Sequence, residues 1–166
     1  MAPDQRIIFE AWMKTHGDAV LRLCWMCLRD RAMAEDALQE TFLRVWQAMD
    51  RFVPESDAHV RAWICRIALN VCRDVQRSRW WRHIDSRLSL DDLPEPAVPV
   101  SEASRELFLL VAALPDRLRL PVVLRCEYGM TEAEAARALG ISRPTLHKRF
   151  REACRRLAVA WKEDEG

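Results

Sequence analysis

Apolar residues recur at helical spacing through most of this 166-residue chain, and this periodicity restricts the folds open to it. Between residues 33 and 49, for example, they lie at i, i+4, i+7, i+8 and i+11, counted from Leu38. Only four glycines occur, β-branched residues are sparse and tyrosine occurs once, so strands are poorly supported. We therefore predict an all-α fold.

Three helices are expected in the first half of the chain. They cover residues 6–29 (as one helix, or as two broken near Gly17), residues 33–49 and residues 58–79. Pro54 and the polar residues after it mark a loop before the third helix. That helix is expected to turn inward a stripe made of Trp63, Ile64, Ile67, Ala68, Val71 and Val75.

A proline-containing acidic segment interrupts the helical pattern. Prolines 94, 96 and 99 fall within residues 85–104, and proline at that density blocks a continuous helix. We predict two small helical domains, residues 1–83 and 105–166, joined by a flexible acidic linker over residues 84–104. After the linker, helical spacing returns. One apolar stripe, made of Leu107, Leu110, Val111 and Leu114, stops at Pro115, and a further helical segment runs from about residue 116 or 118 to 128.

The net charge of +1 conceals a strong segregation of charge along the chain. Six arginines face one acid between residues 61 and 83, and seven Lys or Arg face one acid between residues 140 and 162. Residues 84–106 carry six acids against two arginines. Two basic segments separated by an acidic one suggest two anion-binding sites, although a basic helix face is also common on ordinary soluble surfaces.

Residues 131–156, TEAEAARALGISRPTLHKRFREACRR, predict a helix-turn-helix. Thr131 and Glu134 form a capping box, Gly140 suits a helix C-terminus, and Ser142 with Pro144 suits the start of a second helix. Small and apolar residues stand where the two helices cross: Ala135, Ala136 and Leu139. The second helix is expected to bury Leu146, Phe150, Leu157 and either Cys154 or Ala153, and to present Arg143, Thr145, His147, Lys148, Arg151 and Arg155 outward.

Those outward residue types suit a helix that lies in the major groove. Residues near the N-terminus of such a helix read base edges, and basic residues farther along contact phosphates. Arginine is the commonest reader of guanine. The alternative interpretation is a helical hairpin whose basic face is merely solvated, but the cap, the glycine turn, the small crossing residues and the basic face all agree with DNA binding.

The segment from Leu114 to Leu157 resembles region 4 of the extracytoplasmic-function sigma factors, the small members of the sigma-70 family. Independently, RDRAMAEDALQETFLRVWQAM (residues 29–49) resembles region 2.2, and HVRAWICRIALNVCRDVQRSR (residues 59–79) resembles regions 2.3 and 2.4. The resemblance covers nearly the whole chain outside the linker, in the family's order. It implies a region 2-like domain, a region 4-like domain and a connector.

The resemblance also implies roles for individual residues. One face of the second helix would bind the clamp of the largest polymerase subunit through Asp36, Gln39, Glu40 and Arg44. The third helix would bind the −10 element through Arg66, Asn70, Arg73 and Arg77, with Trp80 as a stacking residue, and the loop at residues 51–59 would capture an extruded base. Trp80 and Trp81 could instead close a helix end against the core. The −35 element would contact Arg143, Pro144, Thr145, His147, Lys148, Arg149, Arg151 and Arg155.

The expected partners are RNA polymerase core (the clamp and the flap), promoter DNA and an anti-sigma factor. We expect no enzymatic activity, no cofactor and no metal, and a cytoplasmic protein that is monomeric when free and not inserted in a membrane. Cys24 and Cys27 have CxxC spacing, but they fall within an apolar helical stripe and no second ligand pair follows, so they are interpreted as buried structural cysteines.

Two other functions remain open at this point. The chain could be a helix-turn-helix repressor or activator that acts without being a polymerase subunit, or a helical adaptor that binds only proteins. The basic residues in both halves argue against the adaptor, and the region 2-like half argues against the repressor. Binding to polymerase core separates all three functions.

Overall fold

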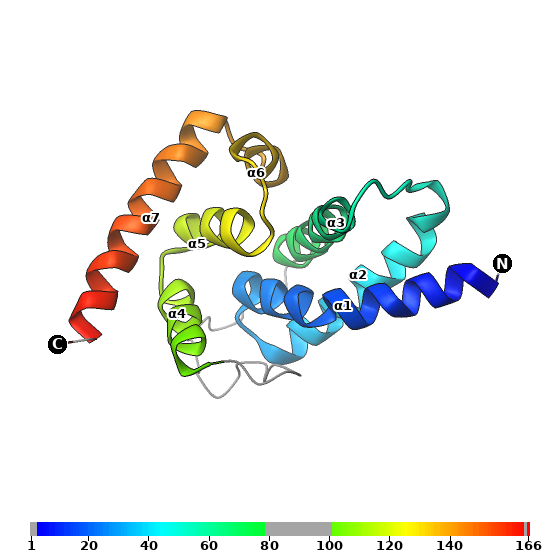
Figure 1. The fold of residues 1–166 in the computed structure, drawn as a ribbon, viewed down its shortest axis with the longest axis horizontal. Coiled ribbons are helices and arrows are strands. Elements are labelled where there is room, and N and C mark those ends of the chain that lie inside the picture. The colour runs from blue at the N-terminus through cyan, green and yellow to red at the C-terminus, as the bar shows by residue number, and fades with distance from the viewer. Residues whose placement is uncertain (1–2, 79–100, 165) are drawn as a thin grey trace. The chain divides into compact units, whose positions relative to one another are not determined.

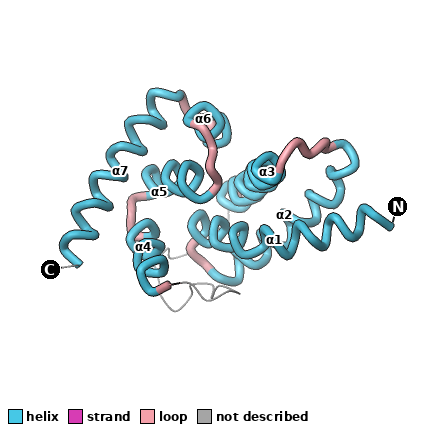
Figure 2. The backbone as a smooth tube through the Cα atoms, viewed as in Figure 1, coloured by secondary structure: helices cyan, strands magenta, loops and turns pink. Residues whose placement is uncertain are grey.

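The computed structural model describes residues 3–78, 101–164 and 166, and every element in that part of the chain is a helix (Figure 2). The chain divides into two compact units, Met1–Ala97 and Val98–Gly166. The all-α prediction is therefore confirmed. Of the segment predicted as the linker, residues 84–100 lie outside the described residues, as do Trp80 and Trp81.

The first unit packs three long helices against one another: α1 (Pro3–Leu28), α2 (Arg31–Ala48) and α3 (Asp57–Arg77) (Figure 1). A short 3-10 helix, η1 (Met49–Arg51), follows α2. Trp25, Val45 and Ile64 each supply a fully buried side chain to the shared core, one from each helix. Burying such apolar side chains from water is what holds the three helices together.

Of the two alternatives for the first helix, the continuous one is observed. α1 passes through Gly17 without a break, and a Cβ at Gly17 would meet no atom within 4 Å. The helix ends where Arg29 adopts a positive φ of 54° and donates its backbone N–H to the Trp25 carbonyl at 2.7 Å. Asp30 then caps α2 by accepting from the backbone N–H of Met33 at 2.8 Å.

The six residues of the inward stripe predicted for α3 are all at least partly buried. Ile64, Ala68 and Val71 are buried, whereas Trp63, Ile67 and Val75 are half-buried. Ser56 caps the helix by accepting from the backbone N–H of His59 at 3.1 Å. The helix ends at Arg77, two residues before its predicted end, and Ser78 bonds back to the Val75 carbonyl.

The second unit contains α4 (Glu102–Ala112), α5 (Asp116–Val122), η4 (Val123–Glu127), α6 (Glu132–Leu139) and α7 (Arg143–Asp164). α7 packs against α4, α5 and α6. Pro121 lies within α5, and η4 continues it as a turn of π-helix. The core of this unit includes Leu118, Leu124, Met130 and Leu146.

Two details of the first helix of this unit differ from prediction. Ser101 accepts from the backbone N–H of Ser104 at 3.1 Å, so α4 begins at Glu102, inside the segment expected to be linker. Leu107, expected in the buried stripe, is 45% exposed. The reason is that α4 buries Val111 and Ala112 at its C-terminal end, one turn beyond Leu107.

Candidate nucleic-acid interface

The turn between α6 and α7 sets where the basic helix begins. Thr131 accepts from the Glu134 backbone N–H at 3.2 Å, and the Glu134 carboxylate accepts from the Thr131 backbone N–H at 2.9 Å, so the predicted capping box is formed. Gly140 has φ 66° and ψ 32°, the left-handed conformation that glycine adopts without a Cβ penalty. Ser142 then caps α7 by accepting from the Thr145 backbone N–H at 3.3 Å.

The buried side of α7 is defined by Leu146 and Ala153, which are both fully buried. Of the two alternatives left open by the sequence, Ala153 rather than Cys154 faces the core, and Cys154 is exposed. Phe150 is half-buried beneath the guanidinium of Arg125, which lies 5.5 Å from the ring centroid. This cation–π contact fastens the middle of α7 to η4.

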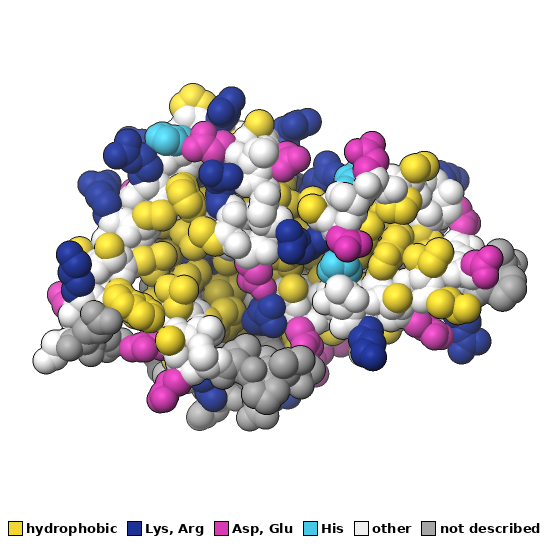
Figure 3. Space-filling view, viewed as in Figure 1, with side chains coloured by type: hydrophobic (Ala, Val, Ile, Leu, Met, Phe, Trp, Pro, Cys, Tyr) yellow, Lys and Arg dark blue, Asp and Glu magenta, His cyan; other side chains and the backbone are white. Residues whose placement is uncertain are grey.

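The opposite side of α7 carries the residues predicted to bind DNA. Lys and Arg side chains lie along this helix in the space-filling view (Figure 3). Two of the predicted residues are half-buried: Arg149, and Thr145, whose hydroxyl hydrogen-bonds to Ser142 at 2.7 Å within the helix cap. The other six are exposed, namely Arg143, Pro144, His147, Lys148, Arg151 and Arg155.

Glu132, which the sequence did not single out, contacts two of these residues. Its carboxylate lies 2.6 Å from His147 Nδ1 and accepts from Arg143 Nε at 3.5 Å. The hydrogen bond with His147 and then the charge on the basic neighbours lower the pKa of Glu132. The contact joins residues 11 and 15 positions apart across the turn, so helical periodicity gave no signal for it.

In the first unit, a row of polar residues runs along the solvent side of α3. Arg66, Asn70 and Arg77 are exposed, and Arg73 is half-buried with its guanidinium 3.4 Å from the Asn70 side-chain oxygen. The four positions are spaced i, i+4, i+7 and i+11, which places them on one helix face. The face opposite them buries Ile64, Ala68 and Val71.

The loop before α3 is fastened by aromatic rings. Phe52 stacks on Trp63 with the ring centroids 4.0 Å apart and the planes 7° from parallel, and Trp12 packs edge-on against both rings. His59 lies against Phe52, and its Nδ1 accepts from the Glu55 backbone N–H at 3.2 Å. These contacts give residues 52–59 a defined conformation, which their sequence alone did not indicate.

The candidate polymerase-binding face of α2 is partly occupied by an ion-pair network. Asp36 and Gln39 are exposed, whereas Arg44 donates to Glu40 at 2.9 Å and to Asp74 of α3 at 3.0 Å. These two hydrogen bonds raise the pKa of Arg44, and the bond to Glu40 has the larger effect. Asp36 and Gln39 are therefore open to solvent, whereas Glu40 pairs with Arg44 and Arg44 connects α2 to α3.

Comparison with known proteins assigns each unit to a region of the sigma-70 family. Residues 12–82 match the family model of sigma-70 region 2, and residues 104–157 match that of sigma-70 region 4. The RNA polymerase sigma factor NccH of Alcaligenes xylosoxydans xylosoxydans is 32% identical over 170 residues, covering 95% of this chain and 89% of NccH. The ECF RNA polymerase sigma factor SigL of Mycobacterium tuberculosis is 28% identical, covering 98% of this chain and 93% of SigL. The chain belongs to the extracytoplasmic-function sigma factors of the sigma-70 family.

A solved structure agrees with this assignment. The sigma factor described here resembles CnrH, solved in complex with the cytosolic domain of CnrY, with a TM-score of 0.60 and 25% identity over 96% of this chain and 90% of CnrH. The sequence-based prediction of a sigma factor with regions 2 and 4 in that order is confirmed.

Four of the six cysteines of this sigma factor lie in the first unit, whereas Cys126 and Cys154 are exposed on the second. Cys24, Cys65 and Cys72 are buried and Cys27 is half-buried. A hydrogen bond with the Cys24 thiol, together with burial, raises the pKa of Cys72. Within the described residues no three His, Cys, Asp or Glu side chains are arranged to hold a metal ion. Over the same part of the chain, no helix is both long and apolar enough to cross a bilayer.

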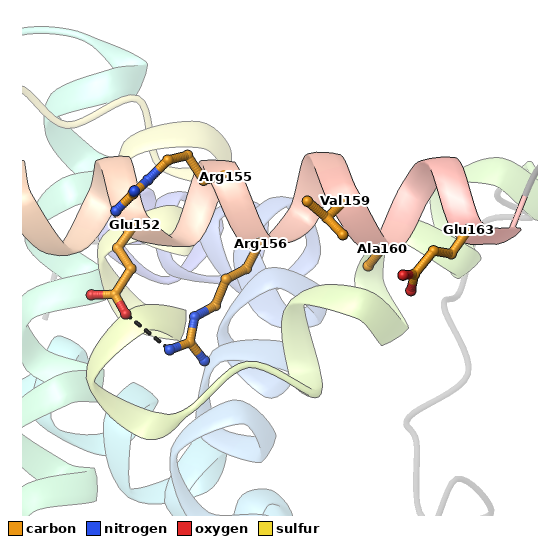
Figure 4. Close-up of a pocket in the computed structure, with 6 residues that line it drawn as sticks. All are labelled: Glu152, Arg155, Arg156, Val159, Ala160 and Glu163. Atoms are coloured by element: carbon orange, nitrogen blue, oxygen red, sulfur yellow. Dashed lines mark hydrogen bonds and ion pairs between the residues drawn. The ribbon is translucent and has the colours of Figure 1, made fainter.

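A hollow lies along the C-terminal half of α7 (Figure 4). Glu152 pairs there with Arg156 at 2.9 Å and also with Arg117 of α5 at 3.0 Å. Arg155, which borders the hollow, is shared with the predicted DNA-binding set.

Proposed function

We propose that this sigma factor recognises a bipartite promoter, with α7 binding the −35 element and α3 binding the −10 element. One observation carries the proposal. Each unit presents a solvent-facing row that contains several arginines on a helix whose other side is buried, and these helices fall in the segments that match regions 4 and 2. Two such DNA-binding surfaces on one chain increase each other's effective concentration on a promoter.

On α7, the first two turns supply the base-reading residues. Arg143, Pro144, His147 and Lys148 are exposed there and would meet base edges in the major groove. The residues assigned to the phosphates are Arg149, Arg151 and Arg155. Thr145, whose hydroxyl is engaged in the helix cap, would contact DNA through its remaining surface.

On α3, the row of Arg66, Asn70, Arg73 and Arg77 would bind the −10 element, with Trp80 stacking on an unpaired base. Residues 51–59 would hold the extruded base. The Phe52–Trp63 stack supports this assignment, because a pocket for a flipped base needs a loop of fixed shape.

The exposed Asp36 and Gln39 would bind the clamp of the largest polymerase subunit, together with Glu40 and Arg44 at the edge of this face. Because Arg44 also bonds to Asp74 of α3, clamp binding would be linked to the helix that holds the −10 element. The second unit would contact the flap. In this assignment residues 1–83 and 105–166 are the two functional domains, with the start of α4 from Glu102 added to the second, and the residues between them form the connection.

The further assignments follow from the same family. The sigma factor would act in the cytoplasm, as a monomer when free, as an initiation factor without enzymatic activity or cofactor. An anti-sigma factor would hold it inactive. CnrH was solved in complex with another protein, the cytosolic domain of CnrY, which supports a protein partner besides polymerase.

Run-off transcription on a genomic promoter library, with purified polymerase core in the presence or absence of this protein, tests the proposal. We expect defined start sites that depend on the protein, and aligned templates that give both elements. Arg143→Ala and Lys148→Ala should weaken use of the upstream element about tenfold, and Asn70→Ala should weaken use of the downstream element. Arg155→Ala should reduce the slope of log affinity against log salt by about 1.

Two exposed arginines outside the rows serve as matched controls. Arg31 pairs with Glu35 on α2, and Arg156 pairs with Glu152 on α7. Alanine at either position should leave both elements unchanged. If the protein binds DNA but never directs core to a start site, the proposed promoter recognition is wrong.

A further inference from the structure

Glu132 lies at the end of the helix-turn-helix where α7 begins, and an acid in the first turn of a helix is favoured by the helix dipole. It is the first residue of α6, yet its side chain reaches two residues of α7. The Glu132 side chain is 22% exposed, whereas those of Arg143 and His147 are 69% and 51% exposed. The carboxylate therefore lies beneath the two side chains that it contacts.

Stability alone does not account for this arrangement. Exposed ion pairs contribute little to the free energy of unfolding, and a negative charge close to DNA phosphates opposes binding. The positive charge of Arg143 offsets that repulsion, because its guanidinium donates to the same carboxylate. The carboxylate restricts the side-chain rotamers of Arg143 and His147. Without this contact, a long arginine and an exposed imidazole sample several rotamers.

The contact also decides which atoms face the DNA. An ionised carboxylate only accepts hydrogen bonds, so Nδ1 of His147 must carry the proton. In the neutral ring Nε2 is then the acceptor, and acceptors in the major groove pair with the amino groups of cytosine or adenine. The contact with Arg143 engages Nε and leaves its two terminal amino groups outside that contact.

We propose that Glu132 is a specificity-determining positioning residue, which fixes the His147 tautomer and the direction of Arg143 so that His147 selects adenine or cytosine, the bases whose amino groups face the major groove. The inference rests on the proposed function, because it assumes that α7 reads the −35 element. Glu132 itself does not touch the bases. It acts through the two residues above it.

The test compares Glu132→Ala with Glu152→Ala in run-off transcription on templates whose upstream element is randomised. Glu152 is a matched control, because its side chain is 24% exposed and also holds two cationic partners, Arg117 and Arg156. His147→Ala first identifies the base pair that His147 reads. We expect Glu132→Ala to lower the preference at that pair about tenfold without weakening non-specific DNA binding, and Glu152→Ala to leave the preference unchanged.

Two further variants separate positioning from a purely structural role. Glu132→Gln keeps an oxygen that accepts from Nδ1, so it should retain most of the preference at the His147 position. Combining Glu132→Ala with His147→Ala should add no further loss at that position, because the two act on the same contact. Circular dichroism on each variant checks that the second unit stays folded.

The outcomes distinguish the two proposals. If wild-type protein gives no sequence-dependent start sites, the proposed function fails and this inference fails with it. If the wild type is specific but Glu132→Ala has the wild-type preference, or Glu152→Ala changes the preference equally, only the role of Glu132 is overturned. A Glu132→Gln variant as impaired as Glu132→Ala would also overturn it.

Discussion

Replacing Gly140 by alanine tests whether the left-handed turn holds the helix-turn-helix together. Gly140 has a φ of 66°, and a Cβ built there would meet no atom within 4 Å. The substitution therefore introduces no clash with neighbours, and its whole cost lies in the backbone conformation. The turn closes through two hydrogen bonds, from Gly140 N–H to the Arg137 carbonyl at 3.2 Å and from Ile141 N–H to the Ala136 carbonyl at 3.0 Å.

The size of the effect follows from two opposing contributions. Holding alanine in the left-handed region costs about 1–2 kcal/mol, and alanine restricts the unfolded chain, which returns about 0.4–1 kcal/mol. The net destabilisation of the second unit should be about 1 kcal/mol. Gly17 is the matched control, because it lies inside α1 and a Cβ there also meets nothing within 4 Å. Gly17→Ala should stabilise the first unit by about 0.5–1 kcal/mol.

Hydrogen exchange of the backbone amides measures the two units separately in the full-length protein. Protection in α6 and α7 should fall in Gly140→Ala, and protection in α1 should rise in Gly17→Ala. Thermal unfolding should show the transition of the second unit lowered by roughly 4–8 °C. If both substitutions changed stability in the same direction, the conformational argument would be refuted, because the surroundings of the two glycines are equally open.

Three further predictions concern burial. Burial, and then the charge of Arg61, lower the pKa of His16 in the folded protein, so the unfolded chain takes up this proton first as the pH falls. The free energy of unfolding should therefore decrease as the pH drops below 6.5, the ordinary pKa of histidine. In urea unfolding at a series of pH values, His16→Asn should reduce that decrease. Maleimide should label the exposed Cys126 in the native protein and the buried Cys65 only after unfolding, as peptide mass spectrometry would show; equal labelling rates would contradict the structure. Leu146→Ala should cost about 2–4 kcal/mol, because this fully buried side chain leaves a cavity beneath α7, and a loss under 1 kcal/mol in denaturant unfolding would argue against that core position.

Several features of the candidate DNA-binding surface were predictable because they depend on neighbours along the chain. The Thr131 capping box, the Gly140 turn and the start of α7 near Ser142 all rest on contacts between residues three to five positions apart. Residue identity at such short separations is enough to specify the backbone. The row on α3 was predictable for the same reason, since helical spacing alone puts Arg66 and Asn70 on one face.

Other features required the packing of helices against one another. The choice between Ala153 and Cys154 depended on the rotation of α7 against its neighbours, because adjacent positions differ by only about 100° around a helix. The exposure of Leu107 depended on where along α4 the other helices make contact. Periodicity predicts that a helix has an apolar stripe, but not how much of that stripe other helices bury.

The sequence by itself determined that this protein is all-helical, where its helix-turn-helix begins, and which sigma-70 regions it contains. Only the tertiary structure decided which polar groups meet. Glu132 reaches His147 across 15 residues, Arg44 reaches Asp74 across 30, and Phe52 stacks on the ring of Trp63 from a loop. The physical reason is that such contacts depend on the crossing and rotation of whole helices, which are fixed by the packing of the complete core and not by any short stretch of sequence.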